Sequence, residues 1–150
     1  MRETEEFTRS FREVQLKFSR FYVVILSQLG LTLPQYALLN QLLVTDMMPM
    51  TQTSKKLHIT KPAVTGLVDR LEKNKFLKRI SHPKDRRIYL LQIQPKGIKL
   101  VRQIQEHVLQ VLLDTLAQFT SNERKVINQF YALLSQTLGK ILTQPRKLKK

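Results

Sequence analysis

The segment covering residues 51–97 constrains the fold more than any other part of this 150-residue chain. Its first part, residues 51–57, predicts a short helix with Thr51 as the N-cap, because a threonine hydroxyl at that position can accept a hydrogen bond from the first turn. Residues 58–60 then form a turn, and a second helix is expected over residues 61–76. Two helices joined by so short a turn indicate a helix-turn-helix unit.

The second helix carries signals for its start and for its buried side. Thr60 is expected to be the N-cap, and Pro62 lies in the first turn, where a missing N–H leaves no hydrogen bond unmade. Four apolar residues share one helical face, because they are spaced at i, i+3, i+4 and i+7. They are Val64, Leu67, Val68 and Leu71. The opposite face of this helix is therefore expected to be exposed.

A predicted hairpin follows the second helix. Residues 77–81 and 88–93 are its two strands, and the sequence His-Pro-Lys-Asp-Arg-Arg joins them. A helix pair followed by a basic hairpin is the layout of a winged helix-turn-helix, which sets one helix into the major groove of DNA. The pattern therefore predicts a DNA-binding lobe.

The exposed face of the second helix suits close approach to DNA. Its N-terminal end carries small and hydrogen-bonding side chains, and threonine and alanine methyl groups can touch a thymine methyl. The free N–H groups of a helix N-terminus also favour phosphate. An amphipathic helix with a solvated basic face is the alternative that this helix alone leaves open.

The hairpin and its flanking residues carry a specific resemblance. The matching motifs are Leu71-Glu72-Lys73, Phe76-Leu77-Lys78-Arg79 at the start of the first strand, Asp85-Arg86-Arg87 at the tip, and the Gln94-Pro95-Lys96-Gly97 turn. With these motifs in this order, the chain resembles the MarR (multiple antibiotic resistance regulator) family of winged helix-turn-helix transcription factors over most of its length. The resemblance implies a sequence-specific regulator of transcription.

By this resemblance, Arg87 enters the minor groove, Asp85 orients it, and Arg86 serves phosphate or the hairpin itself. A guanidinium on a narrow hairpin tip suits the negative potential of an A·T-rich minor groove. The roles of the two arginines could be reversed, because the sequence does not fix the register of the hairpin. A charged turn that is merely solvated is the remaining alternative.

The helix-turn-helix and the wing together supply the residues that are expected to contact DNA. They are Thr51, Thr53, Ser54, Thr60, Lys61, Pro62, Ala63, Thr65, Gly66, Arg70, Lys73, Lys78, Lys84, Asp85, Arg86 and Arg87.

Positive charge is concentrated on the same part of the chain. Residues 51–102 carry fourteen basic and three acidic side chains, whereas residues 1–50 carry five of each. Such a field supplies affinity for a polyanion. Because no segment is apolar enough to span a bilayer, double-stranded DNA is favoured over a membrane as the partner. A nucleoid-type architectural DNA-binding protein and a winged-helix module for RNA or protein stay open as alternatives.

Apolar stripes near both ends of the chain predict an assembly surface. Phenylalanine, leucine and other apolar residues recur every three or four residues there. They offer more apolar surface than a small lobe can bury, so a homodimer on a pseudo-palindromic operator is expected, although the stripes could instead form intramolecular core.

The expected fold class is mainly α with a small β-wing (α+β), a winged helix-turn-helix with long N- and C-terminal dimerisation helices. One domain is expected over residues 1–150, with the lobe at about 32–97, dimerisation helices at about 1–30 and 98–143, and a basic tail at 144–150.

The resemblance also implies a repressor that a small aromatic or phenolic ligand releases from its operator. Candidate ligand contacts are Arg12, Arg20, Tyr22 and Tyr36, and no cofactor is expected.

Composition and spacing disfavour other chemistry. The chain has no cysteine, which excludes disulfides, thiolate metal sites and thiol redox sensing. His58, His82 and His107 are too far apart to form a metal motif, and no nucleophile–base pair or phosphate-binding glycine loop stands out. We therefore expect neither an enzyme nor a metal site. The polar start of the sequence shows no secretory segment, which predicts a cytoplasmic protein.

Overall fold

The computed structural model describes residues 2–143, and the chain divides into two compact units, one ending at Glu106 and the other beginning at His107. The division falls within the helix α5 (Pro95–Leu116). The predicted basic tail, residues 144–150, lies outside the described residues.

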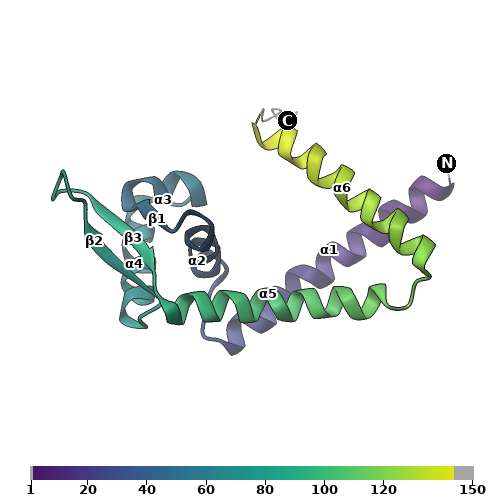
Figure 1. Ribbon diagram of the computed structural model, residues 1–150, viewed down its shortest axis with the longest axis horizontal. Coiled ribbons are helices and arrows are strands. Elements are labelled where there is room, and N and C mark those ends of the chain that lie inside the picture. The colour runs from purple at the N-terminus through teal and green to yellow at the C-terminus, as the bar shows by residue number, and fades with distance from the viewer. Residues whose placement is uncertain (1, 144–150) are drawn as a thin grey trace. The chain divides into compact units, whose positions relative to one another are not determined.

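The first unit contains most of the helices and the whole sheet (Figure 1). In chain order its elements are α1 (Arg2–Gln28), α2 (Leu33–Thr45), β1 (Met47–Pro49), α3 (Met50–Leu57), α4 (Lys61–Lys73), β2 (Leu77–Ser81), β3 (Tyr89–Ile93) and the first part of α5. The second unit holds the rest of α5 and α6 (Ser121–Thr143). The expected mainly α fold with a small β-wing is confirmed.

The first helix of the predicted pair, α3, starts one residue earlier than expected. It begins at Met50 with Pro49 in the N-cap position, so the prediction of Thr51 as N-cap was wrong. His58 follows α3 in the left-handed conformation, with φ of 53°, and thereby turns the chain toward α4.

The second helix of the pair, α4, is confirmed at its start and ends earlier than expected. The hydroxyl of Thr60 accepts a hydrogen bond from the backbone N–H of Ala63 at 3.4 Å, as an N-cap does. The helix ends at Lys73, before the predicted end at residue 76. Lys75 adopts φ of 61°, a left-handed conformation that ends the helix and leads into the wing.

The sheet contains a strand that the sequence did not predict. Its order is β1-β3-β2, all antiparallel, so β3 lies in the centre. Leu91 in β3 pairs with Met48 on one side and with Arg79 on the other. The β2–β3 hairpin is the wing, and its tip extends beyond the helices of the lobe (Figure 1). Strand β1 therefore ties the base of the wing to the segment between α2 and α3.

A closed core supports these elements. The four residues that were predicted to form the inner face of α4 are all buried. Fully buried side chains come from each of α1 to α5 and from all three strands, and include Leu26, Leu38, Leu39, Leu42, Met48, Thr53, Val68, Leu71, Leu77, Leu91, Val101 and Ile104. The helices α3 and α4 and the sheet therefore rest on one shared core.

The junction between the wing and α5 has room only for a glycine. A Cβ atom on Gly97 would lie 2.2 Å from the backbone oxygen of Phe76. That oxygen also accepts a hydrogen bond from the backbone N–H of Gln94 at 2.9 Å. The Lys96 ammonium donates to the backbone oxygen of Asn74 at 3.1 Å. The predicted strand-to-helix turn is therefore a tight anchor for both ends of the hairpin.

The second unit is an α-helical hairpin whose turn is held by side chains. Glu123 accepts the backbone N–H of Thr120 at 2.8 Å and donates its own backbone N–H to the Thr120 hydroxyl at 3.4 Å, which forms a capping box at the start of α6. Arg124 donates to the backbone oxygens of Phe119 and Ala117, both at 2.9 Å. These bonds satisfy carbonyl groups at the end of α5. No side chain from residue 107 to residue 143 is buried.

Among the described residues, no single helix has the length and apolar composition needed to cross a membrane. The pair α1 and α2 meets those two criteria only when taken together, with a bend of 88° between them.

Candidate nucleic-acid interface

The outer face of α4 is built to present small and basic groups. Its inner residues are buried, so Lys61, Pro62, Ala63, Thr65, Gly66, Arg70 and Lys73 are left exposed on the other side. Thr60 is also exposed, at the capped start of the helix. A helix presented in this way can approach a base-pair edge closely.

One hollow joins α3, α4 and the wing. It has a volume of about 220 Å³ and is lined by Met50, Thr51, Ser54, Lys61, Val64, Thr65, Arg87 and Tyr89. Five of these were predicted DNA contacts, from three separate elements. Arg87 lines this hollow and Arg86 does not. Tyr89, the first residue of β3, was not among the predicted contacts, although it lies only two positions after Arg87 of the turn, and this short separation was the available signal.

A second hollow lies along the other flank of α4. Ala63, Gly66 and Arg70 line it together with Thr32, Pro34 and Gln35 near the start of α2, and with Ile59 and Leu67. The predicted α4 residues are therefore divided between two flanks. Lys61 and Thr65 lie with the wing, and Ala63, Gly66 and Arg70 lie toward α2.

The wing tip is ordered by its own hydrogen bonds. The carboxylate of Asp85 accepts the backbone N–H of Arg87 at 3.0 Å, and the Asp85 backbone oxygen accepts the N–H of Ile88 at 3.0 Å. Asp85 was expected to orient the Arg87 guanidinium. In the structure it holds the backbone of Arg87 instead, and so fixes where that side chain starts.

The remaining predicted DNA contacts divide into exposed and buried residues. Lys78, Lys84 and Arg86 are exposed. The prediction was wrong for Thr53, which is fully buried, with a hydroxyl oxygen that has no hydrogen-bond partner. A buried side chain has no surface to offer to DNA. It points inward because α3 turns Thr53 toward the core while Thr51 stays on its outer side.

An ionic cluster that the sequence reasoning missed links α4 to the wing. The guanidinium of Arg79 in β2 forms ion pairs with Asp69 and Glu72 of α4. Burial alone would lower the pKa of Arg79, but its hydrogen bonds to Asp69 and Glu72, with the charge of both carboxylates, raise that pKa above its usual value. Carboxylates spaced i, i+3 on a predicted helix, just before a strand that carries an arginine, were the available signal.

Comparison with known proteins agrees with this geometry. The MarR family model matches residues 31–89, which include α2, the helix-turn-helix and most of the wing. YsmB of Bacillus subtilis, described as an uncharacterized HTH-type transcriptional regulator, is 29% identical over 99 residues, which cover 66% of this chain and 68% of that protein. By the match of the family model, residues 31–89 belong to the MarR family. The chain is accordingly a DNA-binding transcriptional regulator, and members of this family are not enzymes.

Solved structures share the fold of this MarR-family regulator. The transcriptional regulator Tm0710 from Thermotoga maritima aligns with a TM-score of 0.77 at 24% identity, covering 93% of this chain and 99% of that one. A variant of MepR from S. aureus, bound to an oligodeoxyribonucleotide, aligns with a TM-score of 0.71 at 23% identity, covering 90% and 97%. At such identities the likeness concerns the winged-helix fold alone.

Of the four predicted ligand contacts in this MarR-family chain, the structure brings two together. The rings of Tyr22 in α1 and Tyr36 in α2 lie 6.0 Å apart between centroids. Burial, with a smaller contribution from Tyr22, raises the pKa of Tyr36. Arg20 is exposed, and Arg12 is exposed almost three helical turns before Tyr22.

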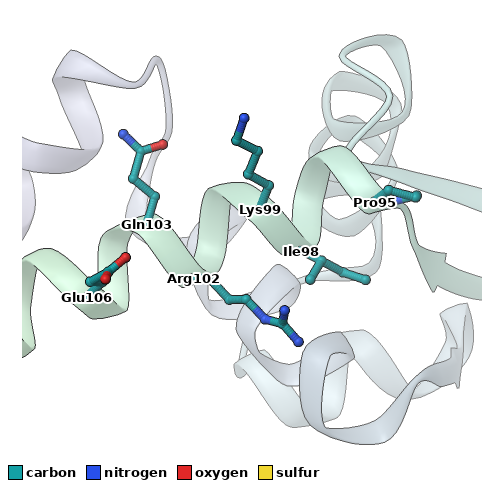
Figure 2. Close-up of a pocket in the computed structure, with 6 residues that line it drawn as sticks. All are labelled: Pro95, Ile98, Lys99, Arg102, Gln103 and Glu106. Carbon is teal, nitrogen blue, oxygen red and sulfur yellow. The ribbon is translucent and has the colours of Figure 1, made fainter.

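A further hollow runs along α5. Figure 2 shows its lining residues, which all belong to this one helix: Pro95, Ile98, Lys99, Arg102, Gln103 and Glu106. Lys99 and Gln103 point to one side of the helix, and Ile98 and Arg102 point to the other. Because a single helix provides the whole lining, the side chains do not converge on one point as those of a ligand site do.

Within residues 2–143, no three histidine or acidic side chains gather as metal ligands would. His58 ends α3, and the Nδ1 atom of His82 accepts the backbone N–H of Lys84 at 3.2 Å.

Proposed function

We propose that this MarR-family regulator is a homodimeric repressor of a pseudo-palindromic operator, and that a small aromatic or phenolic ligand releases it. The observation that carries the dimer is α6, a helix of 23 residues of which none is buried. A helix of that length with an apolar stripe needs a partner surface to cover it.

The apolar surface of the second unit supports a symmetric partner. A hollow of about 380 Å³ between α5 and α6 is lined mainly by leucines with Phe119, Ile127 and Tyr131. Other large apolar side chains are exposed along α6, namely Val126, Phe130, Leu133, Leu134, Leu138, Ile141 and Leu142. Exposed apolar patches of this kind mark protein interfaces. A second copy of the chain would cover them and present two α4 helices to two half-sites.

The DNA contacts follow from the two hollows beside α4. Lys61, Thr65 and neighbouring small residues would read base edges in the major groove. Arg87 would enter the minor groove, which is supported by its place in the hollow shared with α4 and by the hydrogen bond that its backbone N–H donates to the Asp85 carboxylate. Lys78, Lys84 and Arg86 would contact phosphates, because they are exposed and not part of that hollow.

The ligand proposal rests on the contact between α1 and α2. Tyr22 and Tyr36 form an aromatic pair there, and their rings are tilted by 36°. Such a pair can stack with a phenolic ring, and a cation such as Arg20 could pair with its anionic group.

The deciding experiment is a footprint of the protein on duplexes selected from a random pool, at near-physiological salt and with random duplex as competitor. A bounded, symmetric footprint that survives the competitor supports a specific dimer. Specific sites bind at least about 10³-fold tighter than random DNA. Uniform coverage that disappears as salt rises would instead indicate an architectural protein, which the net charge of +15 favours.

The ligand is tested on the same duplex. Titrating salicylate should raise the melting temperature of the protein and weaken its binding to the operator, because a ligand that prefers one conformation shifts the equilibrium toward it. If neither quantity changes, that class of ligand is ruled out.

A further inference from the structure

The cluster of Arg79, Asp69 and Glu72 joins the two elements that face DNA. Arg79 lies in β2, the first strand of the wing, whereas Asp69 and Glu72 lie in α4. The guanidinium contacts both carboxylates. Glu72 also accepts the backbone N–H of Arg79 at 2.8 Å, so one carboxylate holds both the side chain and the backbone of the strand.

These bonds matter because β2 is an edge strand. In the order β1-β3-β2, it has a neighbouring strand on one side only. An edge strand has backbone groups that no neighbouring strand satisfies. Glu72 accepts a hydrogen bond from one of these groups, the backbone N–H of Arg79. It therefore attaches β2 to α4 on the side of the strand that has no neighbouring strand.

The wing tip depends on what lies beneath it. The pairing of β2 with β3 ends at Ser81 and Tyr89, and the hydrogen bonds of the tip beyond this pair join residues 82, 84, 85, 87 and 88 of the hairpin to one another. Arg87 of the hairpin lines the same hollow as Lys61 and Thr65 of α4. The angle between the hairpin and α4 thus sets the separation of Arg87 from the start of α4.

We propose that Arg79, through its two carboxylate partners, is a positioning residue for DNA binding that fixes the wing relative to α4. The inference rests on the proposed role of Arg87 in the minor groove. Two groups that must enter two different grooves together gain affinity when their spacing is set before binding. Arg79 itself is not a DNA contact here, since its side chain is only 20% exposed and both of its partners are acidic.

The contact of Arg79 with Asp69 and Glu72 is a clamp between β2 and α4. The first test uses substitutions for which loss of the clamp and the change in net charge predict opposite changes in DNA affinity. Glu72→Gln and Asp69→Asn each remove a negative charge from α4, so electrostatics alone would strengthen binding to DNA. Loss of the clamp should instead weaken binding to the selected duplex, by about tenfold for Glu72→Gln, a size typical of coupling within one network. The matched control is Glu106→Gln, the same charge change at an exposed residue of α5, which should leave binding unchanged or slightly stronger.

The second test is a double-mutant cycle on binding to the same duplex. Arg87→Ala should weaken binding strongly, and Arg79→Lys should weaken it in the wild-type background but hardly at all once Arg87 is absent. The control partner is Arg70, which lies on the other flank of α4, so Arg79→Lys and Arg70→Ala should be additive. Melting curves of every variant show whether the protein is folded at the assay temperature.

The outcomes separate the two proposals. If the wild-type protein selects no duplex over random DNA, the proposed function fails and the positioning role fails with it. If the wild type is specific but Glu72→Gln behaves as Glu106→Gln does, or Arg79 and Arg87 are additive, the positioning role alone is overturned. Weaker binding of Glu72→Gln together with non-additivity restricted to the Arg79–Arg87 pair supports it.

Discussion

The two units of this regulator bury their apolar residues to very different extents. In the first unit, leucines of α2, α4, β2 and β3 are at most 1% exposed where the core closes, for example Leu38, Leu71 and Leu91. In the second, Leu133 and Leu138 of α6 are 57% and 50% exposed, although they belong to a repeating apolar stripe as the core leucines do. Apolar content therefore does not locate a core. What matters is whether the chain itself supplies a surface to cover each stripe.

The largest expected effect comes from charging the exposed stripe of α6. Leu138→Glu should abolish the proposed dimer and weaken operator binding by roughly 10²–10⁴-fold, because a monomer binds only one half-site. Sedimentation and DNA titration measure the two effects. Gln136→Glu adds the same charge at another exposed position of α6 without removing an apolar side chain, and should change neither. A Leu138→Glu protein that stays dimeric contradicts the proposed interface.

The same kind of residue in the first unit should act on folding instead. Leu91→Ala removes a fully buried side chain from the central strand β3, and should lower the free energy of unfolding by about 2–5 kcal/mol. Val44→Ala, at an 80% exposed position of α2, should change it by less than about 0.5 kcal/mol. Urea denaturation measures both. Equal losses at the two positions would mean that burial in the closed core does not decide the cost.

A stabilising substitution sharpens the comparison from within the closed core. Thr53 buries a hydroxyl oxygen without a hydrogen-bond partner, and Thr53→Val replaces it with a methyl group of similar size. The free energy of unfolding should rise by about 1 kcal/mol, because a buried polar group without a partner is destabilising. Denaturation midpoints with DNA-binding assays measure the change and its independence from function. A loss of DNA affinity in a stable Thr53→Val protein would restore Thr53 as a contact.

The smallest effect concerns alkaline pH and the buried Tyr36. Burial raises the pKa of this tyrosine in the folded state, so the neutral form is favoured there. That contribution to stability is fully present below the ordinary tyrosine pKa of about 10 and is lost as pH rises toward the folded value. Tyr36→Phe should therefore flatten the decline in stability above about pH 10. Melting curves across that range would contradict this if the variant declines as steeply as the wild type.

The local part of the fold could be predicted from sequence because it depends on residues close in the chain. Each signal used for α4 lies within one or two helical turns of the feature that it predicts. These signals are Thr60, the apolar residues at i, i+3, i+4 and i+7, and the short turn before the helix. The end of α4 could not be predicted in the same way. Lys75 takes a left-handed conformation that glycine usually signals, and lysine gives no such sign.

The features that could not be predicted from the sequence depend mostly on tertiary contacts. Strand β1 is only three residues long, contains a proline and shows no alternation, and it is a strand because β3 pairs with it. The inward side of Thr53 and the contact of Arg79 with α4 likewise depend on packing between elements. Tyr89 was the exception, because it lies only two residues after Arg87 and this short separation could have indicated that both line the same hollow.

The position of β3 in the centre of the sheet has a consequence for synthesis on the ribosome. Both of its neighbours, β1 and β2, precede it in the chain, so neither has its partner until residues 89–93 have emerged. Until then Met48 cannot pair with Leu91. Contacts of such long sequence separation form slowly compared with local helices. The helices of the lobe can form first, and the sheet closes in one late step that brings the base of the wing onto them.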